Sequence, residues 1–200
     1  MTTTLDTSDR FATARKAMVD SQLRTSGVNA PFVLERMGAV ARERFVPEEL
    51  RHAAYMDRAI RLPDGGVLPA PVFHGMLLEE ARPRGEDTVL IVDGGSGYLA
   101  ELVRPMVTSV ENIDVAAGIA GKAKAKDVSL LLIDGAIEEL PKALAKRLAD
   151  GGRICTGLVE RGVTRLATGR KVAGSVSLVA VAETGIPRLP AFDAPPRWSF

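Results

Sequence analysis

The segment VLIVDGGSGYLAELV, residues 89–103, constrains this chain more than any other part of its sequence. An apolar run over 88–93 is typical of a buried parallel strand, and a glycine cluster follows it directly. The next residues have the spacing of an amphipathic helix. Glycine lets the backbone approach a ligand closely, and ligands of open α/β sheets bind at the carboxyl ends of strands. The segment therefore predicts a site for a nucleotide-like cofactor.

The glycine loop by itself leaves three interpretations open. Gly95, Gly97 and Ala100 satisfy the dinucleotide-binding pattern G-x-G-x-x-A. Gly94, Gly95 and Gly97 suit the loop of S-adenosylmethionine-dependent methyltransferases equally well. Any tight turn from a strand to a helix also favours glycine, so a purely structural role stands beside the two ligand-binding roles.

Further periodic segments predict the rest of the architecture. Strands are expected over 129–134, 153–156, 163–167 and 175–181, the last two as an antiparallel pair. Helices are expected over 10–24, 30–42, 72–81 and 140–148, with Asn29 as the N-cap of the second and residues 1–9 as a polar tail. This alternation predicts a doubly wound α/β sheet with antiparallel C-terminal strands and an N-terminal helical cap.

Length and composition limit the number of domains and the classes of partner. The 200 residues suit one domain, in which 1–84 form the helical cap and a substrate loop and 85–200 form the sheet. A net charge of +1 and 4% aromatic residues weigh against nucleic acid as a partner. The single Cys155 and two histidines argue against a disulfide or a metal site. Without a signal peptide or a membrane-spanning run, we expect a cytoplasmic protein with no membrane partner.

Six segments of the sequence together resemble one enzyme family. The chain is similar to the protein-L-isoaspartate (D-aspartate) O-methyltransferases, and the matching segments occur in the family's order. They are MVDSQLR (18–24), RERFVPEEL (42–50), AYMDRAIRLPDGG (54–66), VLIVDGGSGYLAELV (89–103), LLLIDGAIEELPKAL (130–144) and LADGGRI (148–154). Together they are far more specific than a glycine loop.

The resemblance implies a Rossmann-like class I methyltransferase fold with an added N-terminal helical segment. It also implies S-adenosylmethionine as cofactor and methyl transfer to an isoaspartyl carboxylate of damaged proteins or peptides. A carboxylate is already nucleophilic at neutral pH, so such an enzyme has to align the reactants and exclude water rather than supply a strong base. The candidate active-site carboxylate is Asp57. The candidate cofactor-binding residues are Asp93, Gly94, Gly95, Ser96, Gly97, Tyr98, Glu111 and Asp134, and no metal-binding residue is expected.

Two local departures from the family pattern concern the site itself. The glycine motif of the family begins with an acid and a glycine, where this chain has Ile91 and Asp93. Asp93 is interpreted either as a ligand of the cofactor or as a structural residue, namely an Asx-turn residue or a cap for the following helix. The family's T-x-S-Q-P pattern, placed near the reacting carboxylate, is matched here by residues 67–71, VLPAP, so its hydroxyl groups are absent. His74 and Cys155 are interpreted as structural, buried residues.

The third departure is the short stretch after the glycine loop. Glu111 is a candidate for the acid that ends the second strand and accepts hydrogen bonds from ribose hydroxyls. Only residues 112–128 then precede the next strand, too few for a helix, a third strand and their connections. We expect that an edge strand and its helix are missing, or alternatively that 109–115 is that edge strand and the second strand is lost. The exposed edge would be protected by Glu111, Asp114 or a second subunit in a homodimer.

Three functions follow as hypotheses. The first is an isoaspartyl methyltransferase, and the second is a degenerate methyltransferase fold that binds cofactor weakly or not at all and acts as a binding or scaffold protein. The third, a dinucleotide-binding module, leaves the other matching segments unexplained. Because the acid and hydroxyl positions depart from the family pattern, the sequence leaves catalytic activity undecided between the first two.

Overall fold

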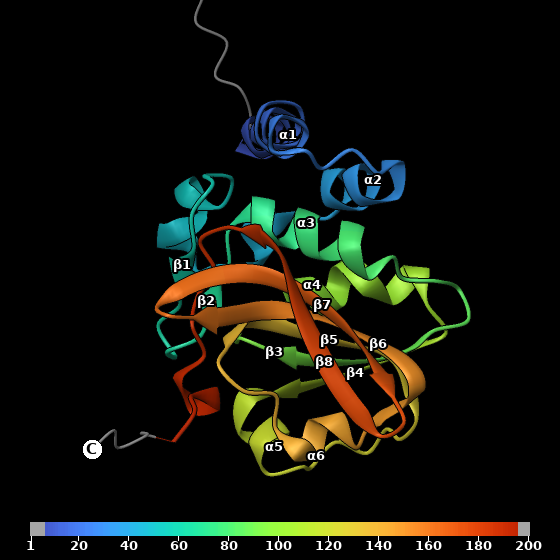
Figure 1. Ribbon diagram of the computed structural model, residues 1–200. Coiled ribbons are helices and arrows are strands. Elements are labelled where there is room, and N and C mark those ends of the chain that lie inside the picture. The colour runs from blue at the N-terminus through green and yellow to red at the C-terminus, as the bar shows by residue number, and fades with distance from the viewer. Residues whose placement is uncertain (1–6, 196–200) are drawn as a thin grey trace, which may run out of the picture.

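A six-stranded sheet forms the centre of the molecule in the computed structural model, which describes residues 7–195 (Figure 1). In the order in which they lie, the strands are β4 (Ser109–Asp114), β3 (Thr88–Asp93), β5 (Val128–Ile137), β6 (Leu148–Glu160), β7 (Val163–Val172) and β8 (Ser175–Glu183). The first four are parallel, whereas β7 and β8 are each antiparallel to the strand before them. The predicted α/β sheet with antiparallel C-terminal strands is therefore confirmed.

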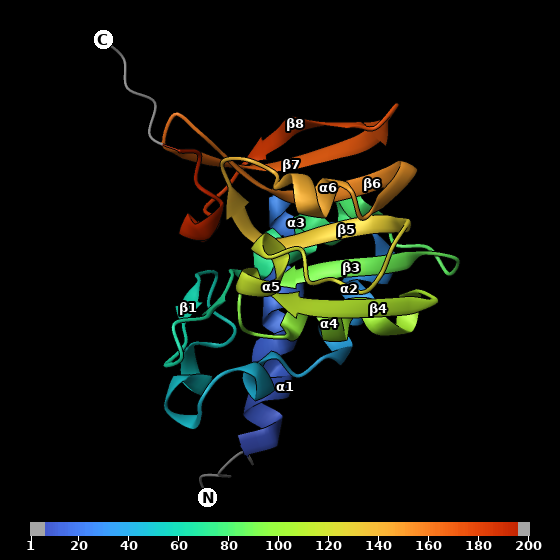
Figure 2. The ribbon, with the colours of Figure 1, turned by 90° about the horizontal axis from the view of Figure 1, so that it is seen from below.

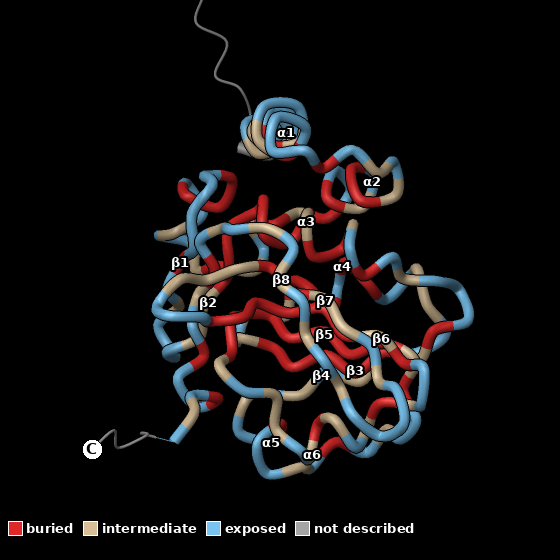
Figure 3. Tube along the Cα trace, in the orientation of Figure 1, coloured by how far each residue is buried: buried red, intermediate tan, exposed pale blue. Residues whose placement is uncertain are grey.

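Helices cover both faces of this sheet. On one face lie α3 (Pro71–Ala81) and α4 (Tyr98–Val103), and on the other lie α5 (Val115–Ile119) and α6 (Lys142–Ala145) (Figures 1 and 2). Side chains of a strand point alternately to its two faces, so Val89 and Ile91 pack with α3 and α4, while Leu90 and Val92 pack on the α6 side. The central strands are therefore buried on both faces, as Figure 3 shows.

The N-terminal helices pack on α3, on the side away from the sheet (Figure 1). The first, α1 (Thr7–Met18), continues through a π-helical and a 3-10 turn up to Gly27, whose positive φ of 88° ends it. Residues 7–9 begin this helix, so the expected polar tail is wrong there, and residues 1–6 lie outside the described range. The second helix is α2 (Pro31–Ala39).

The start of α2 differs from the prediction. Its N-cap is Ala30 rather than Asn29, and no side chain of the cap residue bonds the helix. Instead the carboxylate of Glu79, from α3, accepts hydrogen bonds from the backbone N–H groups of Asn29 (3.1 Å) and Ala30 (3.2 Å). An N-cap side chain accepts N–H groups two or three residues into a helix, whereas Glu79 bonds the two residues before α2 and so ties the entry of α2 to α3.

A short hairpin connects the cap to α3 and reaches the glycine loop. Two 3-10 helices, Arg42–Phe45 and Glu48–Ala53, precede strands β1 (Ile60–Arg61) and β2 (Val67–Leu68), which pair antiparallel. The backbone N–H of Val67 donates to the carbonyl of Gly94 at 2.9 Å. The hairpin therefore lies directly against the loop that follows β3.

The order of the strands decides between the two alternatives for the short segment. Strand β4 pairs directly with β3 and is an edge strand among the described residues, so it is the second strand and the third strand is missing. Glu111 lies within β4, three residues before its end, and its carboxylate accepts hydrogen bonds from the backbone N–H groups of Lys124 (2.8 Å) and Ala125 (2.6 Å). The prediction that Glu111 ends the strand is wrong, because β4 continues to Asp114. Protection of this edge by Glu111, Asp114 or a second subunit stays a prediction.

The C-terminal half contains less helix and more strand than expected. The helix predicted over 140–148 is limited to Lys142–Ala145, because Leu148 already pairs with Val128 in the sheet. Strands β7 and β8 extend to a tight turn at Ala173 and Gly174, both with positive φ, in place of the longer loop predicted. The division into residues 1–84 and 85–200 stays a prediction, although one apolar core joins the N-terminal helices to the sheet.

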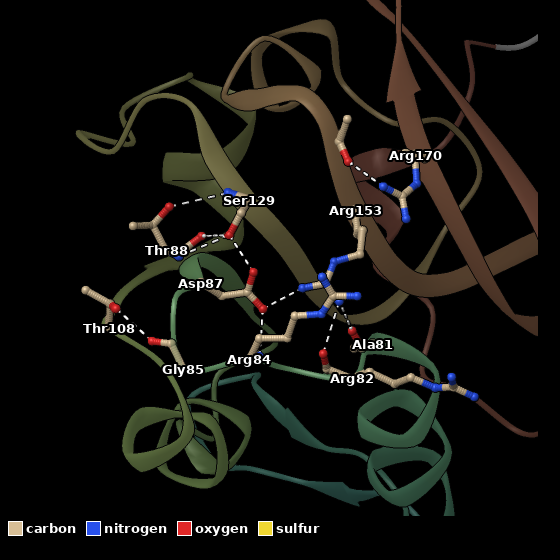
Figure 4. Close-up of polar contacts among 11 residues, drawn as sticks. Ala81, Arg82, Arg84, Gly85, Asp87, Thr88, Thr108, Ser129, Arg153 and Arg170 are labelled. Atoms are coloured by element: carbon tan, nitrogen blue, oxygen red, sulfur yellow. Dashed lines mark hydrogen bonds and ion pairs between the residues drawn. The ribbon is translucent and has the colours of Figure 1, made fainter.

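A cluster of polar groups closes the amino-terminal end of the sheet (Figure 4). The Asp87 carboxylate accepts hydrogen bonds from the Ser129 hydroxyl (2.7 Å) and the Arg84 N–H (2.8 Å), and it forms an ion pair with Arg153. Arg153 also donates to the carbonyls of Ala81 (2.9 Å) and Arg82 (3.0 Å). These contacts join the end of α3 to β5 and β6 through the residue that precedes β3.

Candidate active site

The polar groups of the glycine loop gather at the carboxyl ends of β3 and β4. Asp93 and Asp114 are the last residues of these strands and lie side by side in register. The Asp93 carboxylate accepts hydrogen bonds from the backbone N–H of Gly95 (2.8 Å) and from the side-chain amide of Asn112 (2.9 Å). The first contact is an Asx turn, so that interpretation of Asp93 is confirmed. Asp114 caps α5 by accepting the Ala117 N–H.

Glycine is required in the loop because other backbone segments approach it closely. A Cβ atom on Gly94 would lie 2.7 Å from the carbonyl oxygen of Asp134. A Cβ atom on Gly95 would lie 2.7 Å from the Cα atom of Gly66, and Gly95 has a φ of 115°. Glycine is therefore needed here so that the hairpin and the end of β5 can pack against the loop. This structural role stands beside any role in binding a ligand.

We expect Gly95→Ala to lower the free energy of unfolding by more than about 1 kcal/mol, because it forces a left-handed residue and a backbone clash. Gly85→Ala is the matched control, since Gly85 has ordinary φ and open space around its Cα. That control should stay within about 0.5 kcal/mol of the parent. Urea unfolding followed by circular dichroism measures both values. Equal effects of the two substitutions would contradict the close approach.

Asp134 lies in a buried network with residues from three other segments. It sits where the pairing of β5 with β6 shifts register between residues 132 and 136, a kind of irregularity that re-aims a side chain. Its Oδ1 lies 2.8 Å from Nε2 of His74, and Nδ1 of His74 lies 3.2 Å from Nη1 of Arg42. An arginine can only donate, so Nδ1 accepts and Nε2 carries the proton that bonds Asp134. A neutral His74 thus bridges a buried cation and a buried carboxylate.

Arg42 is held by the backbone as well as by His74. Its Nε donates to the carbonyl of Ala54 at 2.8 Å, and its Nη2 donates to the carbonyl of Pro69. Its guanidinium lies 4.8 Å from the ring centre of Tyr98, a cation–π contact. Burial lowers the pKa of Arg42, against the opposing effect of Tyr98 and of the Asp134 carboxylate. Arginine is rarely fully buried, so the sequence RERF gave no sign of this position.

Tyr98 is fully buried between the cap and the glycine loop. Its ring makes edge contacts with Phe45 and His74, both at 5.2 Å between centroids. Burial raises the pKa of its phenol, while the charge of Arg42 opposes that change. Tyr98, with 0% exposure, and Asp134, with 1%, therefore present no open surface at the loop. Among the cofactor-binding candidates, the exposed or half-buried groups are at Gly94, Gly95, Ser96 and Gly97 and at the edge-strand residue Glu111.

The C-terminal strap, residues 184–193, fills the space at the end of β5. Its backbone pairs with Ala136, whose N–H donates to the carbonyl of Pro187 (2.7 Å) and whose carbonyl accepts from Leu189 (2.8 Å). The Leu189 side chain lies 2.6 Å from where a Cβ atom on Gly135 would be. Phe192 is 3% exposed and packs beside Gly118 of α5. The open side of the site is therefore at β3 and β4, not at β5.

A cleft of about 810 Å³ opens between the hairpin and the strap. Asp57, Val67 and Ala70 line one side, and Thr164, Ile186 and Arg188 line the other. Val67 and Ala70 are two of the positions that match the family's T-x-S-Q-P pattern. Oδ1 of Asp57 accepts the backbone N–H of Val72, at the start of α3, at 3.2 Å. The structure thus brings Asp57 and the loop before α3 into one cleft beside the glycine loop.

Some functional residues at this end of the sheet were not found from the sequence. The sequence gives no sign that Asn112 or Arg42 has a special role. An Asn or an Arg in a segment rich in charged residues is usually an ordinary surface residue. Asp114 was found only as an edge residue, although its place at the end of β4 is the one expected for an acid that binds ribose. His74 and Cys155 are fully buried, as predicted, and burial raises the pKa of the Cys155 thiol.

Comparison with known proteins decides the family. The model of the protein-L-isoaspartate (D-aspartate) O-methyltransferase family matches residues 13–130, which include most of the cap, the hairpin, the glycine loop, strands β3 and β4 and the start of β5. The chain belongs to this family. The resemblance seen in the sequence is therefore confirmed, and the dinucleotide-binding alternative has no support from the match.

Individual relatives and structures agree with the family match. Protein-L-isoaspartate O-methyltransferase 2 of Anaeromyxobacter sp. is 30% identical over 166 residues, covering 71% of this chain and 68% of the relative. The Koribacter versatilis protein-L-isoaspartate O-methyltransferase is 29% identical over 188 residues, covering 82% of this chain and 85% of the relative. The fold resembles a β-aspartate methyltransferase of Plasmodium falciparum in complex with S-adenosyl-L-homocysteine, with a TM-score of 0.69 and 17% identity over 88% of this chain and 97% of that one.

Two further findings concern the residues that the structure describes. No helix among residues 7–195 is long and apolar enough to cross a membrane. Within the same range, no group of three or more His, Cys, Asp or Glu side chains could hold a metal ion.

Proposed function

We propose that this protein transfers a methyl group from S-adenosylmethionine to an isoaspartyl carboxylate of a protein or peptide. The observation that carries the proposal is the family match over residues 13–130, which spans both the glycine loop and the hairpin that borders the cleft. It favours the enzyme over a scaffold protein, because cap, hairpin and loop are matched together. The relatives named above are isoaspartyl methyltransferases.

The residues at the ends of β3 and β4 fit the cofactor. Gly95, Ser96 and Gly97 are partly exposed and allow a ligand to approach the backbone, and Asp93 and Asp114 place two carboxylates beside them. We propose that Gly95, Ser96, Gly97 and Asp114 hold the cofactor. Asp93 is buried and bonded through both carboxylate oxygens, so it shapes the loop and adds negative charge near a ligand that bears a sulfonium and an ammonium group. When bound, S-adenosylmethionine supplies an electrophilic methyl group on sulfur. We assign no direct contact to Glu111, Tyr98 and Asp134, which are bonded or buried elsewhere.

The cleft provides the other half of the reaction. A substrate carboxylate in the cleft needs alignment and exclusion of water more than it needs a base. Asp57 lines the cleft and is fixed by its bond to Val72, so we propose that it positions the peptide. Val67 and Pro69 stand where the family has hydroxyl residues, and Val67 and Ala70 give the cleft an apolar surface, which excludes water but offers no side-chain hydrogen bond. A cytoplasmic location and a homodimer through an exposed sheet edge stay predictions.

Calorimetric titration with S-adenosylmethionine and S-adenosylhomocysteine tests the cofactor site, and we expect micromolar binding of both. Transfer of labelled methyl groups to an isoaspartyl peptide tests the reaction, with the same peptide containing ordinary aspartate as the matched control. We expect incorporation into the isoaspartyl peptide only. No heat at millimolar ligand, together with no incorporation, would overturn the proposal and leave the scaffold function.

A further inference from the structure

Among the described residues, the charged groups that line the 810 Å³ cleft are three arginines and one aspartate, namely Arg58, Arg61, Arg188 and Asp57. Arg188 is already neutralised, because it forms ion pairs with Asp193 (2.9 Å) and Glu138 (2.6 Å). One carboxylate oxygen of Asp57 already accepts a hydrogen bond from the N–H of Val72, at the start of α3. The charge available to a ligand therefore depends on Arg58 and Arg61.

Arg58 and Arg61 have fixed backbones and free side chains. The N–H of Arg58 donates to the carbonyl of Met56 at 2.8 Å, and Arg61 pairs with Val67 in the hairpin. Both residues are exposed, and neither guanidinium has a hydrogen-bond or ion-pair partner among the residues that the structure describes. Other arginines of the same half of the chain, such as Arg15 and Arg36, are bonded to protein groups.

We propose that Arg58 and Arg61 bind carboxylate side chains of the substrate, so that the cleft selects isoaspartyl sites flanked by aspartate or glutamate. A guanidinium binds a carboxylate through two parallel hydrogen bonds, and two such groups in one cleft favour an acidic segment over a neutral one. The inference rests on the proposed function, because it names the substrate class of the same cleft. The two arginines supply polar contacts on the hairpin that carries apolar residues in place of the family's hydroxyls.

The lining of the cleft favours a peptide over a nucleic acid. Among residues 7–195, no aromatic side chain lines it, so this part of the chain offers no platform on which bases could stack. The chain as a whole carries a net charge of only +1, which gives no extended field for a phosphate backbone. An acidic peptide needs neither feature.

The test compares two fluorescein-labelled isoaspartyl peptides that differ only in four flanking positions, which are glutamate in one and glutamine in the other. Anisotropy titration of the full chain measures both dissociation constants, and methyl incorporation measures kcat/KM for the same pair. We expect the glutamate peptide to be favoured about five- to tenfold in both measurements, the size expected for two exposed ion pairs. The preference should decrease as salt is raised from about 0.05 to 0.5 M.

Variants of the chain assign the preference to these residues. The double variant Arg58→Gln/Arg61→Gln should lose the preference, and Arg58→Lys/Arg61→Lys should keep part of it. Arg84→Gln is the matched control, because it removes an exposed guanidinium at the opposite end of the sheet. A wild-type ratio below about twofold, or a ratio kept in the glutamine double variant, would overturn the inference.

Two further outcomes separate this inference from the proposed function. If neither peptide is methylated but the glutamate peptide still binds more tightly through Arg58 and Arg61, the proposed function fails and the acidic-peptide site stands. If a single-stranded oligonucleotide of equal charge displaces the glutamate peptide at lower concentration than an unlabelled copy of that peptide does, the cleft is a nucleic-acid site and the inference is overturned.

Discussion

Replacing Arg42 by methionine is expected to lower the free energy of unfolding by about 3–5 kcal/mol, the range for leaving a buried charge without its compensating partner. Arg42, His74 and Asp134 are each at most 1% exposed. Methionine approximates the length of the side chain but removes the donors to Ala54, Pro69 and His74. Asp134 would then be a buried carboxylate without a counter-charge. Even in the parent, its Oδ2 has no hydrogen-bond partner within residues 7–195.

Arg44→Met is the matched control for this substitution. Arg44 lies two residues further in the same 3-10 helix, but it is exposed. Its replacement should change stability by no more than about 0.5 kcal/mol. Urea unfolding followed by circular dichroism measures both variants, with equal m-values as the sign that only stability has changed. A loss for Arg42→Met no larger than for Arg44→Met would contradict the buried network.

A second substitution shows whether the loss comes from charge. Adding Asp134→Leu to Arg42→Met removes the carboxylate that would otherwise be buried without a counter-charge. It also fills the space with an apolar side chain. Replacing a whole buried pair by apolar groups is often neutral or stabilising, so the double variant should recover part of the loss. If the two changes destabilise the protein additively, packing of the side chains rather than charge compensation stabilises this region.

Asp87→Asn is expected to cost about 2–3 kcal/mol at pH 7, because it removes the charge that holds Arg153 at the amino-terminal end of the sheet (Figure 4). Asparagine keeps the size of the side chain. It cannot accept from Ser129, Arg84 and Arg153 together as the carboxylate does. The same cluster joins α3, β5 and β6, so the loss should appear in global unfolding.

The effect of Asp87 should depend on pH. Burial would raise the pKa of its carboxyl, but hydrogen bonds from Ser129, Arg84 and Arg153 outweigh it and hold the pKa below its ordinary value. A carboxyl whose pKa is lowered in the folded state stabilises the fold above its unfolded pKa of about 4. That stabilisation is lost as pH falls through the lower, folded pKa. The difference between parent and Asp87→Asn should therefore be largest near pH 7 and shrink below about pH 4.

Asp150→Asn is the control for the pH experiment. Asp150 is exposed at a turn within β6 and should give nearly equal stability to the parent at every pH, within about 0.5 kcal/mol. Chemical unfolding at a series of pH values measures all three proteins. A difference between parent and Asp87→Asn that is the same at pH 7 and pH 3 would contradict a stabilising charge on Asp87.

The accuracy of the sequence predictions followed how local each signal was. Strand β3 begins and ends at the predicted residues, because an apolar run closed by Asp and Gly is complete within six residues. The helix over 140–148 was too long, because pairing of Leu148 with Val128 depends on a distant strand. The cap of α2 was assigned to Asn29, one residue too early, because nothing local shows that Glu79 of α3 bonds the backbone N–H groups of Asn29 and Ala30.

The same distinction explains the candidate site. The glycine loop and the Asx turn of Asp93 were predictable, since their partners lie two residues apart. The role of Glu111 was not, because the residues that it bonds, Lys124 and Ala125, lie 13 and 14 residues further along the chain. The unpaired state of Arg58 and Arg61 was also invisible, since a pairing depends on every element packed nearby.

The sequence by itself determined the family, the alternation of strands and helices, and the place of the glycine loop at the end of a buried strand. Each of these depends on residue types within one short segment or on the order of such segments. Only the tertiary structure decided which polar groups are open to a ligand. Arg42, His74 and Asp134 lie 32 and 60 residues apart along the chain, yet they are buried together. The free energy of a charged or polar group depends on its surroundings. The roles of these three residues therefore depend on the elements that pack around them.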